Sequence, residues 1–219
     1  MIRALIFDMD GTLVDSEKLH FNAWRKVLAR YGINSIPQDD LNRYVGVSNE
    51  QLADDYIHKH RLKVVRTTLV KEKQELYLNM LPDIEPLPGV REIIDRHHGR
   101  YHLAVASSSD RIELQRILDI LGLAGHFDQV VGGDMVRRKK PDPEIYLQTM
   151  QLLEVTPTEA VAFEDSVAGV AAAKDAGMYS IAIPSPLLYG GDFSRADTIL
   201  TRIDQVDDQL LADLKGQFN

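Results

Sequence analysis

The sequence contains no cysteine among its 219 residues. Disulfide bonds, thiolate zinc sites and a catalytic thiol are therefore excluded, and the composition is compatible with a reducing compartment. No stretch reaches the roughly 18 consecutive apolar residues of a membrane-spanning helix. The apolar run at the amino terminus is broken by Arg3 and Asp8 and has neither a charged leader nor a small-residue cleavage site. We expect a cytoplasmic protein that does not bind membranes.

Basic residues are outnumbered: 25 lysines and arginines stand against 33 aspartates and glutamates, for a net charge of −8. This balance argues against nucleic acid as a general partner. Arg137–Lys140 is one dense basic run, of a kind that most often lies on a solvated surface. The hydrophobic fraction of 44% and the length suit one core with a smaller companion domain. We expect a monomer that acts on a small molecule.

Two aspartates follow the first apolar segment. Ile2–Phe7 is short and rich in strand formers, which predicts a buried strand. Ligands of parallel sheets bind beyond the carboxyl ends of the strands, so Asp8 and Asp10, two residues apart, would face one small volume. At roughly 4 Å two such charges repel by about 4 kcal/mol at an effective dielectric near 20, and a hard cation such as Mg²⁺ offsets this. The alternative is that both acids only cap a turn at Gly11.

The whole stretch Asp8–Ser16, DMDGTLVDS, is more specific than the two acids alone. It resembles the first motif of the haloacid dehalogenase superfamily, most closely the branch of β-phosphoglucomutase and the sugar-phosphate phosphatases. The resemblance implies that Asp8 is a nucleophile and Asp10 a general acid and base. Dehalogenases of the superfamily lack the second aspartate, so Asp10 implies phosphoryl chemistry.

The periodicity of the chain divides it into three parts. Residues 15–85 have a helical period with few strand signals, whereas strand and helix patterns alternate after Pro86, Pro88 and Gly89. We therefore expect an α/β fold: a Rossmann-like, doubly wound parallel sheet formed by residues 1–14 and 86–219, with residues 15–85 as an all-helical cap domain. The expected strands are 101–106, 129–131, 160–163, 180–183 and 198–200, and the expected helices are 111–121, 143–153 and 167–176. A loop is expected over 184–194.

Polar residues follow the other expected strands. Ser107 ends one strand, Lys140 precedes a proline-initiated helix, and Glu164 with Asp165 ends another strand. Each has a structural alternative, since Ser109 or Asp110 could cap the next helix and a lysine before proline is often only surface. Two acids at the end of a buried strand would repel unless they bind something.

These positions match the remaining motifs of the superfamily in order. The resemblance implies that Ser107 donates a hydrogen bond to a phosphoryl oxygen and that Lys140, rather than Lys139, holds the phosphate and offsets the carboxylates. It further implies a Mg²⁺ ion held by the carboxylate of Asp8 and the backbone carbonyl of Asp10, together with the acids Glu164 and Asp165.

Substrate contacts are expected from the cap. Ser16, His20 and the Gly46-Val47-Ser48 turn match superfamily positions that approach the substrate. They also have structural alternatives: Ser16 as a helix N-cap, His20 as a satisfied helix residue and Gly46 as a simple turn. Mutases of the family place an arginine after this turn, where the present chain has Asn49. Among the other histidines, His97 and His98 are expected to lie solvated in a polar turn.

Together these observations predict a Mg²⁺-dependent phosphatase that works through an aspartyl-phosphate. Its expected substrates are small phosphorylated metabolites, and sugar phosphates are the first candidates. Two alternatives stay open at this point. One is a β-phosphoglucomutase-type sugar phosphomutase, for which Asn49 is a departure, and the other is a catalytically silent protein that binds a phosphorylated ligand.

Overall fold

The computed structural model describes residues 1–44, 47–185 and 191–214. The chain divides into two compact units, one made of Met1–Asp15 with Glu85–Asn219 and the other of Ser16–Ile84. The first strand therefore belongs to the same unit as the second half of the sequence. The smaller unit lies within the segment 15–85 for which the sequence predicts a cap, and its role as a cap stays a prediction.

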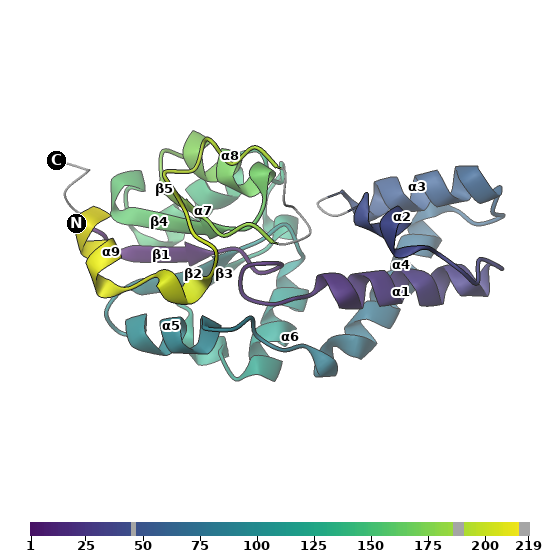
Figure 1. The fold of residues 1–219 in the computed structure, drawn as a ribbon, viewed down its shortest axis with the longest axis horizontal. Coiled ribbons are helices and arrows are strands. Elements are labelled where there is room, and N and C mark those ends of the chain that lie inside the picture. The colour runs from purple at the N-terminus through teal and green to yellow at the C-terminus, as the bar shows by residue number, and fades with distance from the viewer. Residues whose placement is uncertain (45–46, 186–190, 215–219) are drawn as a thin grey trace. The chain divides into compact units, whose positions relative to one another are not determined.

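Within the described residues, the larger unit contains a six-stranded sheet in the order β3-β2-β1-β4-β5-β6 (Figure 1). All neighbouring strands are parallel. The strands are β1 Ala4–Phe7, β2 His102–Ala106, β3 Gln129–Val131, β4 Ala160–Glu164, β5 Tyr179–Ala182 and β6 Thr198–Ile199. Phe7 at the end of β1 is in register with Val105 of β2 and Phe163 of β4. The residues that follow these three strands consequently lie at one edge of the sheet.

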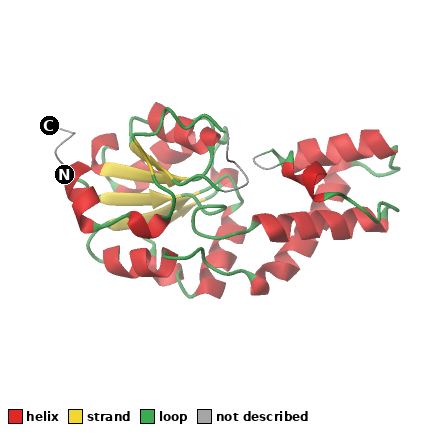
Figure 2. Ribbon diagram, in the orientation of Figure 1, coloured by secondary structure: helices red, strands yellow, loops and turns green. Residues whose placement is uncertain are grey.

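Helices cover both faces of this sheet, which confirms the predicted α/β class (Figure 2). They are α5 Val90–His97, α6 Arg111–Leu121, α7 Glu144–Leu153, α8 Val167–Asp175 and α9 Asp208–Leu214. Side chains alternate between the faces of a strand, and one face carries mostly alanines at Ala4, Ala104 and Ala162. These small residues are buried with Tyr146 of α7 and Ala172 of α8. Small side chains on both partners allow the helices to pack closely against the sheet.

The smaller unit is helical. Its helices are α1 Glu17–Arg30, α2 Gln38–Asn42, α3 Asn49–His60 and α4 Arg66–Met80. Apolar residues at helical spacing on α1, among them Trp24 and Leu28, are buried with Tyr56 of α3 and Leu69 of α4. This unit therefore has a hydrophobic core of its own.

The expectation for His97 is wrong. Its side chain is fully buried at the end of α5, and its ring meets that of Tyr101 edge-on with 5.4 Å between the centroids. The physical reason is helical spacing, because His97 continues the buried positions Val90, Ile93 and Ile94 at intervals of three and four residues. Its neighbour His98 is exposed, as expected.

Two further expectations concern the loop over 184–194 and the lack of a membrane-spanning helix. The loop expected over 184–194 lies partly outside the described residues, and 184–185 and 191–193 are neither helix nor strand. None of the helices in the described residues is long and apolar enough to span a membrane.

Candidate active site

Three buried carboxylates meet where β1 and β4 end. Asp8 follows β1, Glu164 is the last residue of β4 and Asp165 follows it, and one oxygen of each lies within 4.8 Å of the others. The loop after β1 approaches Asp165 closely: a Cβ atom added at Gly11 would lie 2.0 Å from the Asp165 Oδ2 atom. Gly11 also has a φ of +81°, a conformation that glycine adopts without strain. This position thus requires glycine both for the turn and for the approach to Asp165.

Lys140 joins the strand ends. Its Nζ atom donates hydrogen bonds to Asp8 Oδ1 at 2.6 Å, to Glu164 Oε1 at 2.5 Å and to the Ala106 carbonyl at 2.8 Å. The side chain is only 5% exposed, whereas Lys139 is exposed. An ammonium group has three donors, and these three acceptors use all of them. The structure therefore brings the lysine next to proline into the acidic cluster.

Glu164 lies deepest in the cluster. It is fully buried, and its Oε1 atom also accepts a hydrogen bond from the Tyr146 hydroxyl at 2.5 Å. Its Oε2 atom accepts from the Ser166 hydroxyl at 3.3 Å. A Cβ atom at Gly169 would fall 1.9 Å from the same Oε2 atom, so a glycine in α8 is needed to leave room for this carboxylate. Sequence reasoning missed Tyr146, because nothing local distinguishes it from other residues on the sheet-facing side of α7.

The pKa values reflect an excess of buried negative charge. Burial raises the pKa of Asp8 to about 7; Lys140 opposes this shift, and Glu164 and Asp10 add to it. Burial also raises the pKa of Asp165 well above its ordinary value, reinforced by the charges of Asp8 and Glu164. For Lys140, burial acts to lower the pKa, but the two neighbouring carboxylates outweigh it and the pKa is raised. One lysine does not balance three carboxylates, so the donor set suits a divalent cation that binds oxygen ligands.

The loop after β2 carries the predicted Ser107. Its backbone N–H donates to the Val131 carbonyl at 3.1 Å, and its hydroxyl oxygen accepts from the Ser109 N–H at 3.2 Å. The Ser109 hydroxyl in turn donates to Asp10 Oδ2 at 2.8 Å. Sequence reasoning considered Ser109 only as a helix cap, and no sequence signal pairs it with an aspartate so far away in the chain.

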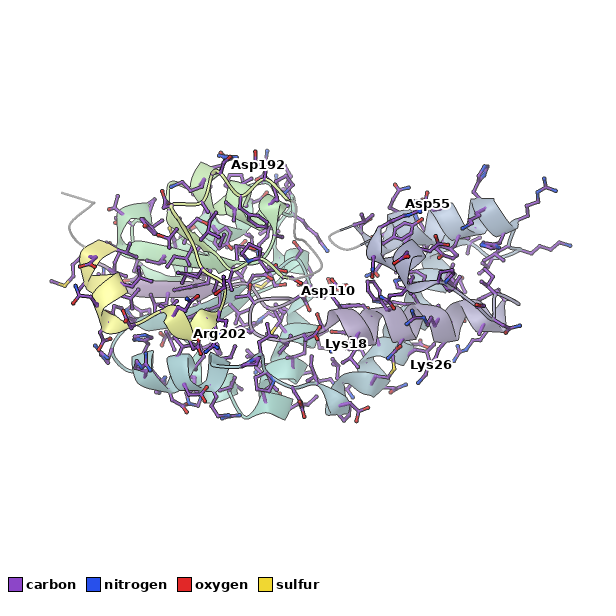
Figure 3. All side chains as sticks on the ribbon, in the orientation of Figure 1. Lys18, Lys26, Asp55, Asp110, Asp192 and Arg202 are labelled. Carbon is purple, nitrogen blue, oxygen red and sulfur yellow. The ribbon has the colours of Figure 1, made fainter. Side chains whose placement is uncertain are left out.

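The side chain of Asp110, one of the two alternatives as a cap, does not cap helix α6, which follows this loop. Asp110, labelled in Figure 3, occupies the N-cap position but makes no side-chain cap hydrogen bond. Instead the Asp134 Oδ1 atom accepts from the Arg111 N–H at 2.8 Å. The cap of α6 is thus supplied from a different segment of the chain.

Of the predicted substrate contacts in the helical unit, Ser16 and His20 can be described. Ser16 is buried at the N-cap position of α1 but makes no side-chain cap hydrogen bond. His20 stacks on Tyr77 with 4.0 Å between ring centroids, and its Nδ1 atom lies 2.6 Å from Nζ of the fully buried Lys73. Burial and the charge of Lys73 lower the pKa of His20 well below its ordinary value. A neutral imidazole can accept a hydrogen bond from the ammonium group.

The predicted turn is described only in part. Gly46 lies outside the described residues. Ser48 caps α3 by accepting a hydrogen bond from the Gln51 N–H at 3.2 Å. Asn49, at the first position of α3, accepts a hydrogen bond at Oδ1 from the Trp24 indole N–H at 3.2 Å. The Asn49 side chain therefore has a structural partner in its own unit.

The family of the chain follows from its similarity to known sequences. The sequence profile of the haloacid dehalogenase-like hydrolases matches residues 5–183. The chain belongs to this family. Family membership and the prediction of a hydrolytic enzyme are thereby confirmed. The matched range includes Asp8, Ser107, Lys140 and Asp165, whose individual roles stay predictions.

Two proteins of known activity and one solved structure are similar to most of the chain. Fructose-1-phosphate phosphatase of Escherichia coli strain K12 is 38% identical over 181 residues, which cover 81% of this chain and 94% of that protein. A phosphorylated carbohydrates phosphatase of Thermotoga maritima is 38% identical over 185 residues, or 82% of this chain and 84% of that protein. A crystal structure of a putative β-phosphoglucomutase from Thermotoga maritima matches with a TM-score of 0.80 and 33% identity, covering 98% of this chain and 99% of that one.

Proposed function

We propose that this hydrolase is a Mg²⁺-dependent phosphatase that hydrolyses small phosphorylated carbohydrates through an aspartyl-phosphate on Asp8. The observation that carries the proposal is the position of Asp8, which is bonded to Lys140 and grouped with Glu164 and Asp165 at the carboxyl ends of β1 and β4. Its similarity to two phosphatases of phosphorylated sugars supports the substrate class.

The first chemical step forms the covalent intermediate. A carboxylate oxygen of Asp8 attacks the phosphorus in line, and the bond from phosphorus to the sugar oxygen breaks as the new bond forms. Asp10 gives its carboxyl proton to the leaving oxygen, so the sugar departs as a neutral alcohol. Lys140 stabilises the transferring group electrostatically, and Ser107 does so by donating a hydrogen bond from its hydroxyl group to a phosphoryl oxygen.

The second step releases phosphate. Asp10, now ionised, takes a proton from a water molecule, and the water oxygen attacks the phosphorus of the aspartyl-phosphate. The bond between phosphorus and the Asp8 oxygen breaks, which restores the Asp8 carboxylate and frees inorganic phosphate. One residue thus serves as acid in the first step and as base in the second.

The metal is assigned to the acidic cluster. The carboxylates of Asp8 and Asp165 and the backbone carbonyl of Asp10 would hold Mg²⁺, which when bound offsets the charge of the carboxylates and of the phosphoryl oxygens. Glu164 already accepts from Lys140, Tyr146 and Ser166. We assign Glu164 to the positioning of Lys140, and a direct metal contact by Glu164 stays a prediction.

The helical unit is proposed to act as a cap that selects the substrate. Lid closure over a phosphoryl-transfer site excludes water and adds contacts to the part of the substrate that does not react. Ser16, His20 and Gly46 are the candidates for these contacts. Substitutions of His20 should therefore change the ranking of sugar phosphates by kcat/KM more than they change the hydrolysis of a small aryl phosphate.

The test is a screen of phosphate release over sugar phosphates, nucleotides and short phosphorylated acids, with Mg²⁺ and with excess EDTA. We expect Mg²⁺-dependent release that is highest for sugar phosphates. Asp8→Asn should abolish turnover, and Asp10→Asn should still bind a phosphate analogue while losing most of kcat. Release that persists in Asp8→Asn protein, or no release from any sugar phosphate, would overturn the proposal.

A sugar phosphomutase is the second candidate, favoured by the similarity to the putative β-phosphoglucomutase. Asn49 weighs against it, because the mutases of the family place an arginine there and the Asn49 amide oxygen is bonded to Trp24. The two activities differ in the acceptor of the phosphoryl group. Incubation of β-glucose 1-phosphate with and without a sugar bisphosphate primer separates them, and we expect phosphate release to exceed isomerisation in both conditions.

A further inference from the structure

We propose that Ser109 is a positioning residue that orients the carboxylate of Asp10 and ties it to the loop that carries Ser107. The inference deepens the proposed function and rests on it, since it concerns the acid and base of that reaction. Its starting point is one contact, the 2.8 Å hydrogen bond that the Ser109 hydroxyl donates to Asp10 Oδ2.

The backbone around this hydroxyl is held on both sides. The Ser109 N–H donates to the Ser107 hydroxyl oxygen at 3.2 Å, and the Ser109 carbonyl accepts from the Gly133 N–H at 2.8 Å. The Ser107 N–H is itself bonded to the Val131 carbonyl at the end of β3. A serine on a backbone with these attachments presents its hydroxyl in a fixed direction.

Two adjacent glycines make the attachment possible. A Cβ atom at Gly133 would lie 2.3 Å from the Ser108 carbonyl oxygen, and one at Gly132 would lie 2.3 Å from the Arg111 backbone nitrogen. Real Cβ contacts are not this short, so only glycine permits the segment after β3 to press against the loop after β2. The placement of Ser109 is consequently built into the packing of two strand-end loops.

The contact determines which oxygen of Asp10 carries the transferable proton. Because the Ser109 hydroxyl donates to Oδ2, a proton on the Asp10 carboxyl group is directed to Oδ1. In the first step that proton passes from Oδ1 to the leaving sugar oxygen, and in the second step Oδ1 receives a proton from water. Ser109 keeps its own proton in both steps.

The same loop couples acid catalysis to phosphoryl binding. The Ser107 hydroxyl oxygen accepts from the Ser109 N–H, which directs the Ser107 proton away from the loop and leaves it to a phosphoryl oxygen. Ser107 thus orients the transferring phosphoryl group and Ser109 orients the proton donor Asp10, and both serines lie on the same short loop. Precise orientation of this kind strongly affects rates, because small displacements of a reacting group are costly.

The experiment uses the full chain with Mg²⁺ and compares two substrates by kcat/KM, which reports the first irreversible step. Fructose 1-phosphate has a poor leaving group that needs Asp10 as acid, whereas p-nitrophenyl phosphate has a good one that does not. Ser109→Ala should lower kcat/KM for the sugar phosphate about tenfold, the value of one hydrogen bond to a charged group. The loss for p-nitrophenyl phosphate should be less than about twofold, and Ser109→Thr, which retains a hydroxyl, should restore most of the activity.

Two controls separate positioning from a structural effect. Ser108→Ala removes the hydroxyl group that lies between Ser107 and Ser109 in the sequence, and it should leave kcat/KM for both substrates unchanged. In an Asp10→Asn background, Ser109→Ala should have almost no further effect on the sugar phosphate, since it acts through Asp10. Equal losses on both substrates, or additive losses with Asp10→Asn, would overturn the role of Ser109. An inactive wild-type protein would instead overturn the proposed phosphatase.

Discussion

At the scale of single residues, the charged cluster depends on neutral donors as much as on the ion pair. The Tyr146 hydroxyl donates to Glu164, and its ring lies 5.1 Å from the Lys140 ammonium group. Glu164 connects Tyr146 with Lys140, because it accepts hydrogen bonds from both. A buried charge that loses a partner keeps the full cost of its desolvation.

Tyr146→Phe should therefore destabilise the protein by about 2 kcal/mol, the typical worth of a hydrogen bond to a charged group. The measurement is urea unfolding with and without Mg²⁺. Tyr179→Phe is the matched control, because the Tyr179 hydroxyl lies 2.8 Å from the neutral Thr198 hydroxyl. That variant should lose only about 1 kcal/mol, and equal losses would contradict a special role for Tyr146.

His97 gives a second prediction at this scale. Burial lowers the pKa of His97; Asp208 opposes this shift, and the charges of Arg100 and Arg96 add to it. The folded protein therefore binds fewer protons than the unfolded chain, so this contribution to stability is present above about pH 6.5. It is lost as the pH falls below that value, when the unfolded chain takes up the proton.

We expect His97→Phe to reduce the dependence of the unfolding free energy on pH between about 5 and 7. His98→Gln, at the exposed neighbouring position, should retain the dependence of the wild type. The measurement is chemical unfolding at several pH values. A His97→Phe protein with the wild-type slope would assign the pH dependence to other groups.

At the scale of elements, helix α8 of the larger unit carries a glycine, Gly169, that serves the site rather than the helix. Alanine is favoured over glycine inside a helix by about 1 kcal/mol, so Gly169 in α8 is costly for the helix itself. The residue is retained where the Glu164 carboxylate meets α8. The needs of a buried carboxylate thus outweigh local helix propensity at this position.

Gly169→Ala should accordingly destabilise the protein by about 1–2 kcal/mol despite the gain in helix propensity, since overpacking a dense interior costs more. It should also reduce turnover, because Glu164 and Lys140 would shift together. Gly125→Ala is the control, as a Cβ atom there meets nothing within 4 Å. Thermal unfolding and phosphate release measure both effects, and a stabilised Gly169→Ala protein would contradict the account.

At the scale of the whole molecule, the sequence predicts the elements better than the contacts. The expected strands and helices of the larger unit agree closely with the observed ones, because periodicity and punctuation by glycine and proline are local signals. The acidic and basic residues at the strand ends were likewise visible, since each follows a recognisable strand. The hydrogen bonds from Tyr146 to Glu164 and from Ser109 to Asp10 were not predicted, because they depend on how segments far apart in the chain pack together.

A prediction for the whole molecule concerns the proposed Mg²⁺ ion. Without it, Asp8 and Asp165 both have raised pKa values, so protons compete with Mg²⁺. Mg²⁺ affinity should fall by about tenfold for each pH unit below about 7, and Mg²⁺ should raise the unfolding temperature at neutral pH. Asp165→Asn should remove that rise without destabilising the metal-free protein, because it deletes a like charge. Calorimetric titration and thermal unfolding measure these effects, and a rise that persists in Asp165→Asn would place the cation elsewhere.

The central position of β1 also bears on how the enzyme is made. The strand that leads to Asp8 leaves the ribosome before its two partners in the sheet, β2 and β4, which end at Ala106 and Glu164. Residues 16–84 have their own core, and in the sequence they come after β1 and before β2 and β4. The residues of the helical unit are consequently all synthesised before either partner strand of β1 exists. Asp8, the proposed nucleophile, meets Glu164 and Asp165 only after β4 has been synthesised, so truncated products that stop before β4 should lack the acidic cluster.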